Sequence, residues 1–269
     1  MSKNEWGQLK KVIVGIADNA KIPTDIDISL RCVNFADKIT ESEIQKGPYP
    51  QQVIDEANED LETFVDFLKG ESVEVVRPDA TDCNYYNYCP RDSVFVHGDL
   101  TIATPMPIKA RKDEWQAFEK HLTDPLNVPC YHETKLYNTD CIGNKDILAL
   151  TEFAPAFDAA NVIRANEDVL YLISNSGNRL GATLLQNALG DNIKVHLLED
   201  VDSYMHIDST VAFLREGLLL ANPSRIKSMD VLPAPFNTWD VIWAPDPVDA
   251  GHYPGLCNSS IWTWNVNLF

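Results

Sequence analysis

The sequence has no Cys-x-x-Cys pair, no long apolar run and no recognisable leader. Its six cysteines are scattered, so neither a zinc ribbon nor a disulfide framework is indicated, and buried reduced thiols are expected. No window approaches the length of a membrane span, and the amino terminus lacks both an apolar signal core and an Arg-rich transit character. These absences predict a cytoplasmic protein without a membrane contact.

Basic charge is also scarce, because 22 Lys and Arg stand against 40 Asp and Glu and give a formal net charge of −18. A surface for nucleic acid or for an anionic membrane would carry basic patches, so neither partner is expected. Solubility alone can account for the acidity, but carboxylates gathered in a pocket would favour cationic ligands. No Ser- or Gly-rich linker interrupts the chain, so residues 1–269 are predicted to form a single domain.

Hydrophobic periodicity changes several times between the strand and helix patterns. A helix is predicted from residue 51, with Gly70 as its stop. Residues 18–50 lack a clean period and contain three prolines, which indicates a long surface excursion able to serve as a rim or lid. The other predicted helices are 112–122, 178–189 and a short segment at 222–225, and the predicted strands outside the hairpins described next are 9–15, 73–76, 146–150, 193–197 and 239–243.

One unit recurs three times: an aspartate, an apolar strand, a turn of Gly, Asn, Asp or Glu, and a second apolar strand. Asp92, Asp158 and Asp208 open these units, at intervals of 66 residues (158 − 92) and 50 residues (208 − 158). The repetition predicts an α/β domain of ββαβ modules around a central axis, with three equivalent carboxylates converging on one place. Chance recurrence of a strand-turn-strand pattern is the alternative.

The segment 204–210 is the centre of the expected chemistry. In an extended strand His206 and Asp208 share one face. Histidine changes charge near neutral pH whereas aspartate does not, so the pair suits proton transfer on a cationic, nitrogen-rich group; a solvated strand end is the plainer interpretation. The tyrosine cluster at 85–88 is either a loop folded onto the core or a wall for a flat cation.

Six short motifs follow one another over nearly the whole chain. They are Asn4-Glu5-Trp6-Gly7 continuing to Gly15, Pro90-Arg91-Asp92, Thr151-Glu152 with Phe157-Asp158-Ala159-Ala160, Met205-His206-Ile207-Asp208, Asn222-Pro223-Ser224-Arg225, and Ser259-Ser260 before Trp262. Together they resemble the L-arginine:glycine amidinotransferases and their inosamine-phosphate relatives. The resemblance implies a pentein-like α/β propeller of five modules and, without a cofactor, transfer of the amidino group from arginine to an amine such as glycine, which gives ornithine and guanidinoacetate.

The resemblance also implies roles for individual residues. His206 is expected to be the acid and base of the reaction, with Asp158 orienting it. Asp92 and Asp208 are expected to hold the guanidinium nitrogens. Arg225 is expected to bind the α-carboxylate of arginine, for which a surface salt bridge is the alternative. The remaining pocket residues implied are Tyr86, Met205, Ser259 and Ser260.

The sequence departs from the family where the nucleophile is expected. In the family a Gly-Gly-Gly-x-His-Cys-type segment supplies the thiol about one module beyond the Ser-Ser-x-Trp motif, whereas this sequence stops at Phe269. The fifth module is therefore expected to be incomplete, with a complementing C-terminal polypeptide or a homodimer closing it. The alternatives are an inactive arginine-binding or subunit-interaction protein, Cys89 or Cys257 as a substitute nucleophile, and a guanidine-group hydrolase resembling arginine deiminase.

Overall fold

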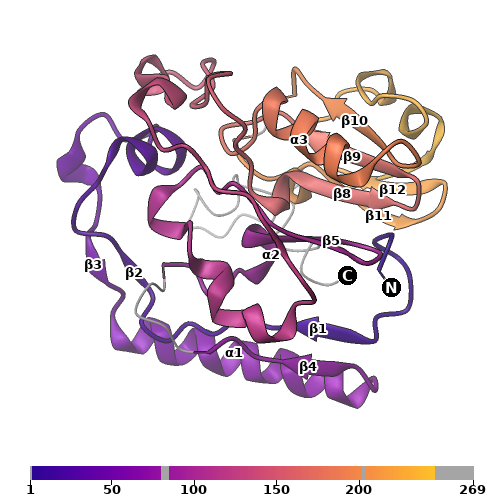
Figure 1. Ribbon diagram of the computed structural model, residues 1–269, viewed down its shortest axis with the longest axis horizontal. Helices are drawn as coiled ribbons and strands as arrows, with labels where there is room; N and C mark the ends of the chain where they lie inside the picture. The colour runs from indigo at the N-terminus through magenta and orange to yellow at the C-terminus, as the bar shows by residue number, and fades with distance from the viewer. Residues whose placement is uncertain (1, 80–84, 202–203, 246–269) are drawn as a thin grey trace.

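The structure is a computed structural model that describes residues 2–79, 85–201 and 204–245. The strands of these residues form five small sheets of two or three strands each. Helix α1 (Gln51–Gly70) lies along one edge of the molecule, beside strands β1 (Lys11–Ile13) and β4 (Glu74–Val76) (Figure 1). β1 and β4 pair in parallel. The helix and both strands were predicted, the strands one or more residues longer than the structure has them.

The three predicted hairpins are present, and each begins with one short helical turn. Their first two strands are antiparallel, and the third strand of each unit pairs in parallel with the second. The first unit is α2 (Pro90–Ser93), β5 (Val94–His97), β6 (Leu100–Ala103) and β7 (Leu126–Asn127). The second unit is η7 (Ala159–Asn161), β8 (Val162–Ala165), β9 (Asp168–Leu172) and β10 (Lys194–Leu198). The third unit is η8 (Ile207–Ser209), β11 (Val211–Arg215), β12 (Leu218–Ala221) and β13 (Asp240–Trp243).

The hairpin turns share a backbone requirement. Gly98, Asn166 and Gly217 have φ values of 61°, 62° and 74°, which glycine adopts at no steric cost and asparagine tolerates better than other residues. This is why the turns could be recognised from the sequence. The crossover from β9 to β10 contains helix α3 (Arg179–Leu189), which begins where the Asn178 side chain accepts a hydrogen bond from the Gly181 N–H at 2.9 Å. The helix ends before Gly190, as predicted.

The segment 18–50 differs from its prediction as a surface excursion. It contains β2 (Lys21–Ile22), η1 (Leu30–Asn34), a single π-helical turn, and β3 (Gly47–Pro48). Leu30, Cys32 and Val33 are completely buried in a cluster that also contains residues of the 136–150 region. Buried side chains anchor the central part of this segment, so that part is not a surface excursion, and the role of the segment as a rim or lid stays a prediction.

Two other predicted elements are also wrong. Residues 146–150 form turns, with an isolated bridge between Tyr137 and Leu150 in place of a strand. Residues 222–225 form a turn and not a helix. The predicted helix at 112–122 is present in 3₁₀ geometry, as η4 (Glu114–His121). The remaining short 3₁₀ turns are η2 (Glu41–Glu43), η3 (Lys109–Arg111), η5 (Thr134–Leu136), η6 (Thr139–Cys141), η9 (Met229–Val231) and η10 (Phe236–Thr238).

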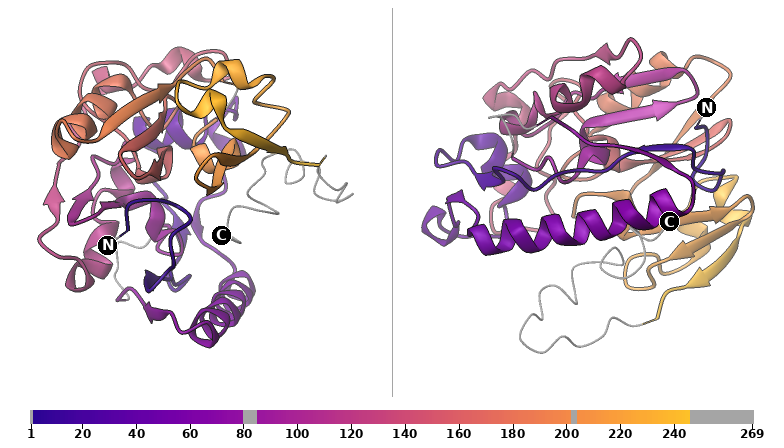
Figure 2. Two further views of the ribbon diagram at one scale, coloured as in Figure 1. Left: turned by 90° about the vertical axis from the view of Figure 1, so that its right-hand side faces the viewer. Right: turned by 90° about the horizontal axis from the view of Figure 1, so that it is seen from below.

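The N-terminal segment joins two of the hairpin units. Glu5 accepts from Arg164 Nε at 2.8 Å and from Arg164 Nη2 at 3.1 Å, and Arg164 Nη1 donates to the Val96 carbonyl at 2.6 Å. One arginine of β8 is thereby held by the N-terminal segment and by β5. The views in Figure 2 show this segment running beside the hairpins before the chain enters β1. In the described part of the chain, no helix combines the length and apolarity needed to cross a membrane.

Candidate active site

The helical turns that open the three hairpin units meet one another. α2 packs against η7, and η7 packs against η8. These contacts bring Asp92, Asp158 and Asp208 into one region, as the repeat predicted. The segment 204–210 is not a strand, however: His206 precedes η8 and Asp208 lies inside it, so the two do not share a strand face. Tertiary packing, and not strand alternation, gathers the acids around His206.

His206 and Asp158 form a buried pair. Nε2 of His206 lies 2.8 Å from Oδ2 of Asp158, and Asp158 is only 1% exposed. Burial raises the pKa of Asp158. Burial disfavours the imidazolium of His206, but the carboxylates of Asp158 and Asp92 outweigh it and raise the pKa of His206 to about 10. His206 is therefore a cation at neutral pH in this state.

Asp92 contacts a buried arginine that the sequence analysis did not single out. Arg111, 1% exposed, donates from Nη1 to Asp92 Oδ2 at 2.9 Å and from Nε to Glu114 Oε2 at 2.8 Å. Its Cζ lies 5.0 Å from the centroid of the Tyr86 ring. Burial opposes ionisation of Asp92, but His206 and Arg111 outweigh it and lower the pKa of Asp92. The flat cation on the tyrosine wall is thus the protein's own Arg111.

Arg91, in the first hairpin unit, contacts both the third unit, through Asp208, and the second unit. Nε of Arg91 lies 4.0 Å from Oδ2 of Asp208, and Nη2 of Arg91 donates to the Val162 carbonyl at 3.1 Å. Asp208 also contributes to the raised pKa of His206. Arg91, Arg111 and Glu114 are the site residues that sequence reasoning missed. The spacing of Arg111 and Glu114, three apart beside an apolar Trp115, was the available signal of a buried pair.

Met205 directly precedes His206 in the chain, and Arg225 follows strand β12. Arg225 Nη1 donates to the hydroxyl of Ser209 and, at 3.4 Å, to that of Thr210. The partly buried Met205 packs against the cluster that contains Leu30 and Cys32. The other predicted pocket residues, Ser259 and Ser260, and the candidate thiol of Cys257 lie outside the described residues.

The thiol of Cys89 lies close to the acids but is poorly suited to be a nucleophile. Burial raises the pKa of Cys89 well above its ordinary value, and the negative charge of Asp92 adds to this effect. Burial likewise raises the pKa of Cys32 and of Cys130 to about 12, and it raises that of Cys141. The thiolate, which is the reactive form, is disfavoured in all four cysteines of the described residues.

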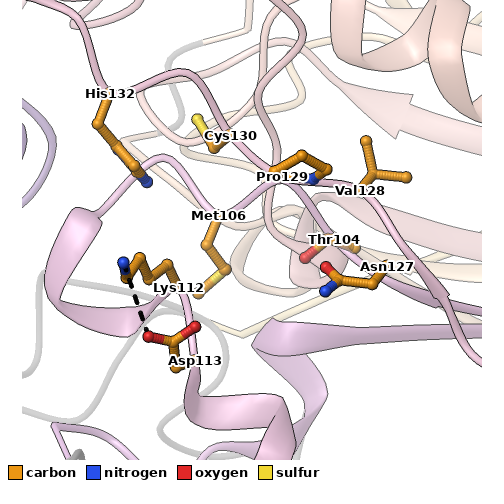
Figure 3. Close-up of a pocket in the computed structure, with 9 residues that line it drawn as sticks. All are labelled: Thr104, Met106, Lys112, Asp113, Asn127, Val128, Pro129, Cys130 and His132. Atoms are coloured by element: carbon orange, nitrogen blue, oxygen red, sulfur yellow. Dashed lines mark ion pairs between the residues drawn. The ribbon is translucent and has the colours of Figure 1, made fainter.

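A separate cavity of about 220 Å³ lies near η3 and η4 (Figure 3). Figure 3 shows Lys112 and Asp113 at one end, with 3.8 Å between Nζ and Oδ2, and Thr104 and Asn127 toward the other. Both members of this ion pair are about half exposed. The cavity offers space, and burial lowers the pKa of His132 in its lining. The buried carboxylates of Asp92 and Asp158 lie instead beside His206 at α2, η7 and η8, so the candidate site is placed there. Among the described residues, no three His, Cys, Asp or Glu side chains are grouped to hold a metal ion.

Sequence comparison identifies relatives over almost the full chain. An inosamine-phosphate amidinotransferase from Streptomyces glaucescens is 34% identical over 281 residues, which cover 96% of this chain and 79% of that protein. This chain belongs to the amidinotransferase family. An L-arginine:L-lysine amidinotransferase from Pseudomonas savastanoi pv. phaseolicola is 32% identical over 99% of this amidinotransferase-family chain and 79% of that protein. The mitochondrial glycine amidinotransferase of Gallus gallus is 31% identical over 97% of this chain and 69% of that protein.

Structural comparison agrees. The inosamine-phosphate amidinotransferase StrB1 from Streptomyces griseus superposes with a TM-score of 0.86 at 36% identity, covering 92% of this chain and 76% of that one. No family model matches the sequence. The predicted membership of an enzyme family of amidinotransferases, with an α/β pentein-like fold, is confirmed. The roles of the individual site residues stay predictions.

Proposed function

We propose that this amidinotransferase-family chain binds L-arginine by its guanidinium group and takes part in transfer of the amidino group to an amine. The observation that carries the proposal is the 2.8 Å contact of His206 with the buried Asp158, together with the packing of their turns against the turn of Asp92. A raised histidine pKa and a lowered aspartate pKa in one buried cluster are typical of a catalytic site.

In the proposed reaction, the carboxylates of Asp92 and Asp208 hold the guanidinium nitrogens, and Arg225 binds the α-carboxylate of arginine. A thiolate forms a bond to the guanidinium carbon. The bond from that carbon to the ornithine nitrogen breaks as the His206 imidazolium gives its proton to the leaving amine. The neutral His206 then takes a proton from the incoming amine as that amine attacks the amidino carbon and releases the thiolate. Asp158 keeps the imidazole oriented throughout.

The donor and acceptor are supported by the relatives to different extents. Arginine as donor is supported by the name of the L-arginine:L-lysine amidinotransferase and by the carboxylates around His206. The names of the relatives give three acceptors: an inosamine phosphate, lysine and glycine. We therefore propose an amine acceptor and treat glycine, the acceptor expected from the motifs, as one of three to be tested.

The proposal places the nucleophile outside the described cysteines. Because burial disfavours the thiolates of Cys32, Cys89, Cys130 and Cys141, the attacking thiol is assigned to a cysteine other than these four. The same raised thiol pKa values favour a second candidate function, that of a protein that binds arginine without turning it over.

The test is incubation of purified protein with L-arginine and each amine in turn, followed by mass spectrometry. Ornithine and an amidinated amine are expected. Arginine binding without ornithine would favour the second candidate, and citrulline would indicate a hydrolase. His206→Gln should abolish product formation. Asp168→Asn is the matched control, because His196 and Asp168 form another contact, of 2.6 Å, between β10 and β9.

A further inference from the structure

The buried guanidinium of Arg111 is held on three sides. Two carboxylate contacts, to Asp92 at 2.9 Å and to Glu114 at 2.8 Å, use different nitrogens of its planar fork, and the Tyr86 ring lies 5.0 Å from its central carbon. A guanidinium presents its donors in fixed directions, so two such contacts determine where its remaining atoms lie. Arg111 is therefore a rigid link between the start of η4 and the first acid-bearing turn.

The Glu114 side of this link is anchored to the backbone. Oε1 of Glu114 accepts a hydrogen bond from the Tyr86 N–H at 2.7 Å, while Oε2 accepts from Arg111. The Tyr86 ring is itself stacked on Tyr85, with 4.0 Å between centroids and an interplanar angle of 20°. Because Glu114 and Tyr86 are fixed by these contacts, the geometry of Arg111 is set by the scaffold and passed on to Asp92.

We propose that Arg111 is a positioning residue that orients Asp92 for binding the guanidinium of a substrate, an inference that rests on the proposed function. Arg111 donates to Oδ2 of Asp92. A carboxylate has two oxygens and about four acceptor sites, so this contact leaves acceptor capacity on Oδ1 for a substrate N–H. Arg111 does not contact the substrate in this arrangement. It supplies the second half of a buried ion pair, without which a carboxylate at this depth is costly.

Titratable and charged groups surround Asp92 on every element packed against it. Without Arg111, burial and the neighbouring carboxylates would oppose ionisation of Asp92, with His206 and Arg91 as the remaining cations in that set. Removal of Arg111 should therefore raise the pKa of Asp92 and make substrate binding depend on pH. The surrounding groups are Cys89 and Arg91 on its own turn, Arg111 and Glu114 on η3 and η4, and Asp158, His206 and Asp208 at η7 and η8.

The first measurement needs no substrate. The carboxyl carbon of Asp92 is followed by NMR as pH is varied in the unmodified chain, in Arg111→Gln and in Arg111→Lys. The unmodified chain should show no titration of Asp92 between about pH 5 and about pH 8, and Arg111→Gln should show one. Arg111→Lys keeps the positive charge and should show none. Arg179→Gln is the control, since Arg179 pairs with Glu199 at 2.7 Å on the exposed surface.

The second measurement is the affinity for L-arginine over the same pH range by calorimetry. Arg111→Gln should lose affinity about tenfold for each pH unit below the new pKa of Asp92, because only the ionised carboxylate binds. Arg111→Lys should bind more weakly than the unmodified chain at every pH, without the added slope, because a lysine cannot reproduce the fork. A role confined to folding would lower stability in both variants and leave the slope unchanged.

The two measurements separate the failure of each idea. If Asp92 stays ionised throughout in Arg111→Gln, the positioning role is wrong whether or not arginine binds. If the unmodified chain does not bind arginine, the proposed function fails, and the titration still decides whether Arg111 controls Asp92. If Arg111→Gln does not fold, the unmodified chain and Arg111→Lys still provide a test. Titration of Asp92 between about pH 5 and about pH 8 in either of them overturns the proposal. No titration of Asp92 in that range in both of them supports it.

Discussion

The contact between His206 and Asp158 should make the stability of the fold depend on pH, and Asp158→Asn should remove about half of that dependence. The pKa of His206 is raised from an ordinary 6.5 to about 10. A group whose pKa is raised by folding stabilises the fold fully below its unfolded pKa, and that contribution is lost as pH rises through the folded pKa. The unmodified chain should therefore lose stability between about pH 6.5 and about pH 10.

The size of the effect follows from the shift. A shift from 6.5 to about 10 corresponds, at 1.36 kcal/mol per unit, to roughly 5 kcal/mol for the imidazolium. Two effects reduce the loss in Asp158→Asn: burial already penalises the Asp158 carboxylate, and Asp92 still acts on His206. A hydrogen bond to a charged group contributes about 1.5–3 kcal/mol, so a loss of about 2–3 kcal/mol at neutral pH is expected, declining to near zero at about pH 10.

The assay is urea unfolding under reducing conditions at several pH values, with the free energy of unfolding and the m-value determined at each. Asp168→Asn is the control. It changes the same residue type beside another histidine, but its carboxylate is 35% exposed. Parallel loss of stability in the unmodified chain and in Asp158→Asn from neutral pH to about pH 10 would show that Asp158 does not hold the imidazolium.

Three further predictions concern other parts of the molecule. Glu5→Gln should destabilise the chain by about 1–3 kcal/mol at neutral pH, because it breaks the paired contacts with Arg164. Arg164 holds the pKa of Glu5 below its ordinary value despite burial, so the stability difference between the unmodified chain and Glu5→Gln should shrink as pH falls through that lowered pKa. Thermal unfolding at neutral and acid pH will show this. Phe236→Ala should lower the free energy of unfolding in urea by about 3–5 kcal/mol, since the Phe236 ring is completely buried and its centroid lies 5.2 Å from that of the Trp239 ring. A decrease of less than about 1 kcal/mol would contradict this packing. Cys89→Ala should leave ornithine formation, followed by mass spectrometry, unchanged, because burial disfavours the Cys89 thiolate; loss of ornithine in a folded variant would make Cys89 the nucleophile.

The elements that could be predicted from the sequence are those whose signals are local. The hairpin turns needed Gly98, Asn166 and Gly217 at left-handed positions, and these residue types mark turns in any sequence. α1 and α3 carry helical periodicity, and α3 also has the capping Asn178 and the stop at Gly190. The repetition of an acid before each hairpin indicated the convergence of three carboxylates, because the repeat itself places equivalent positions together.

The remainder depends on contacts between distant residues. Residues 204–210 have the alternation of a strand, but packing against η7 folds them into a 3₁₀ turn. Arg111 lies 19 residues from Asp92, and nothing in the spacing shows that the two meet in the core. The segment 18–50 has polar and proline-rich ends, and the burial of Leu30, Cys32 and Val33 depends on residues more than a hundred positions away. Single-sequence patterns carry no information on such pairings.

The acids of the site enter from three separate sheets, and this has a consequence for the dynamics of the protein. A ligand bound by Asp92 and Asp208 beside His206 and Asp158 is released whenever any one of the three hairpin units opens. Ligand binding should therefore raise the opening free energy of all three units together, by RT ln(1 + [L]/Kd), although each unit has its own hydrogen-bonded sheet. Amide hydrogens of β5, β9 and β11 should then slow their exchange by a similar factor on ligand addition, so that three separately hydrogen-bonded sheets exchange together when the ligand is bound.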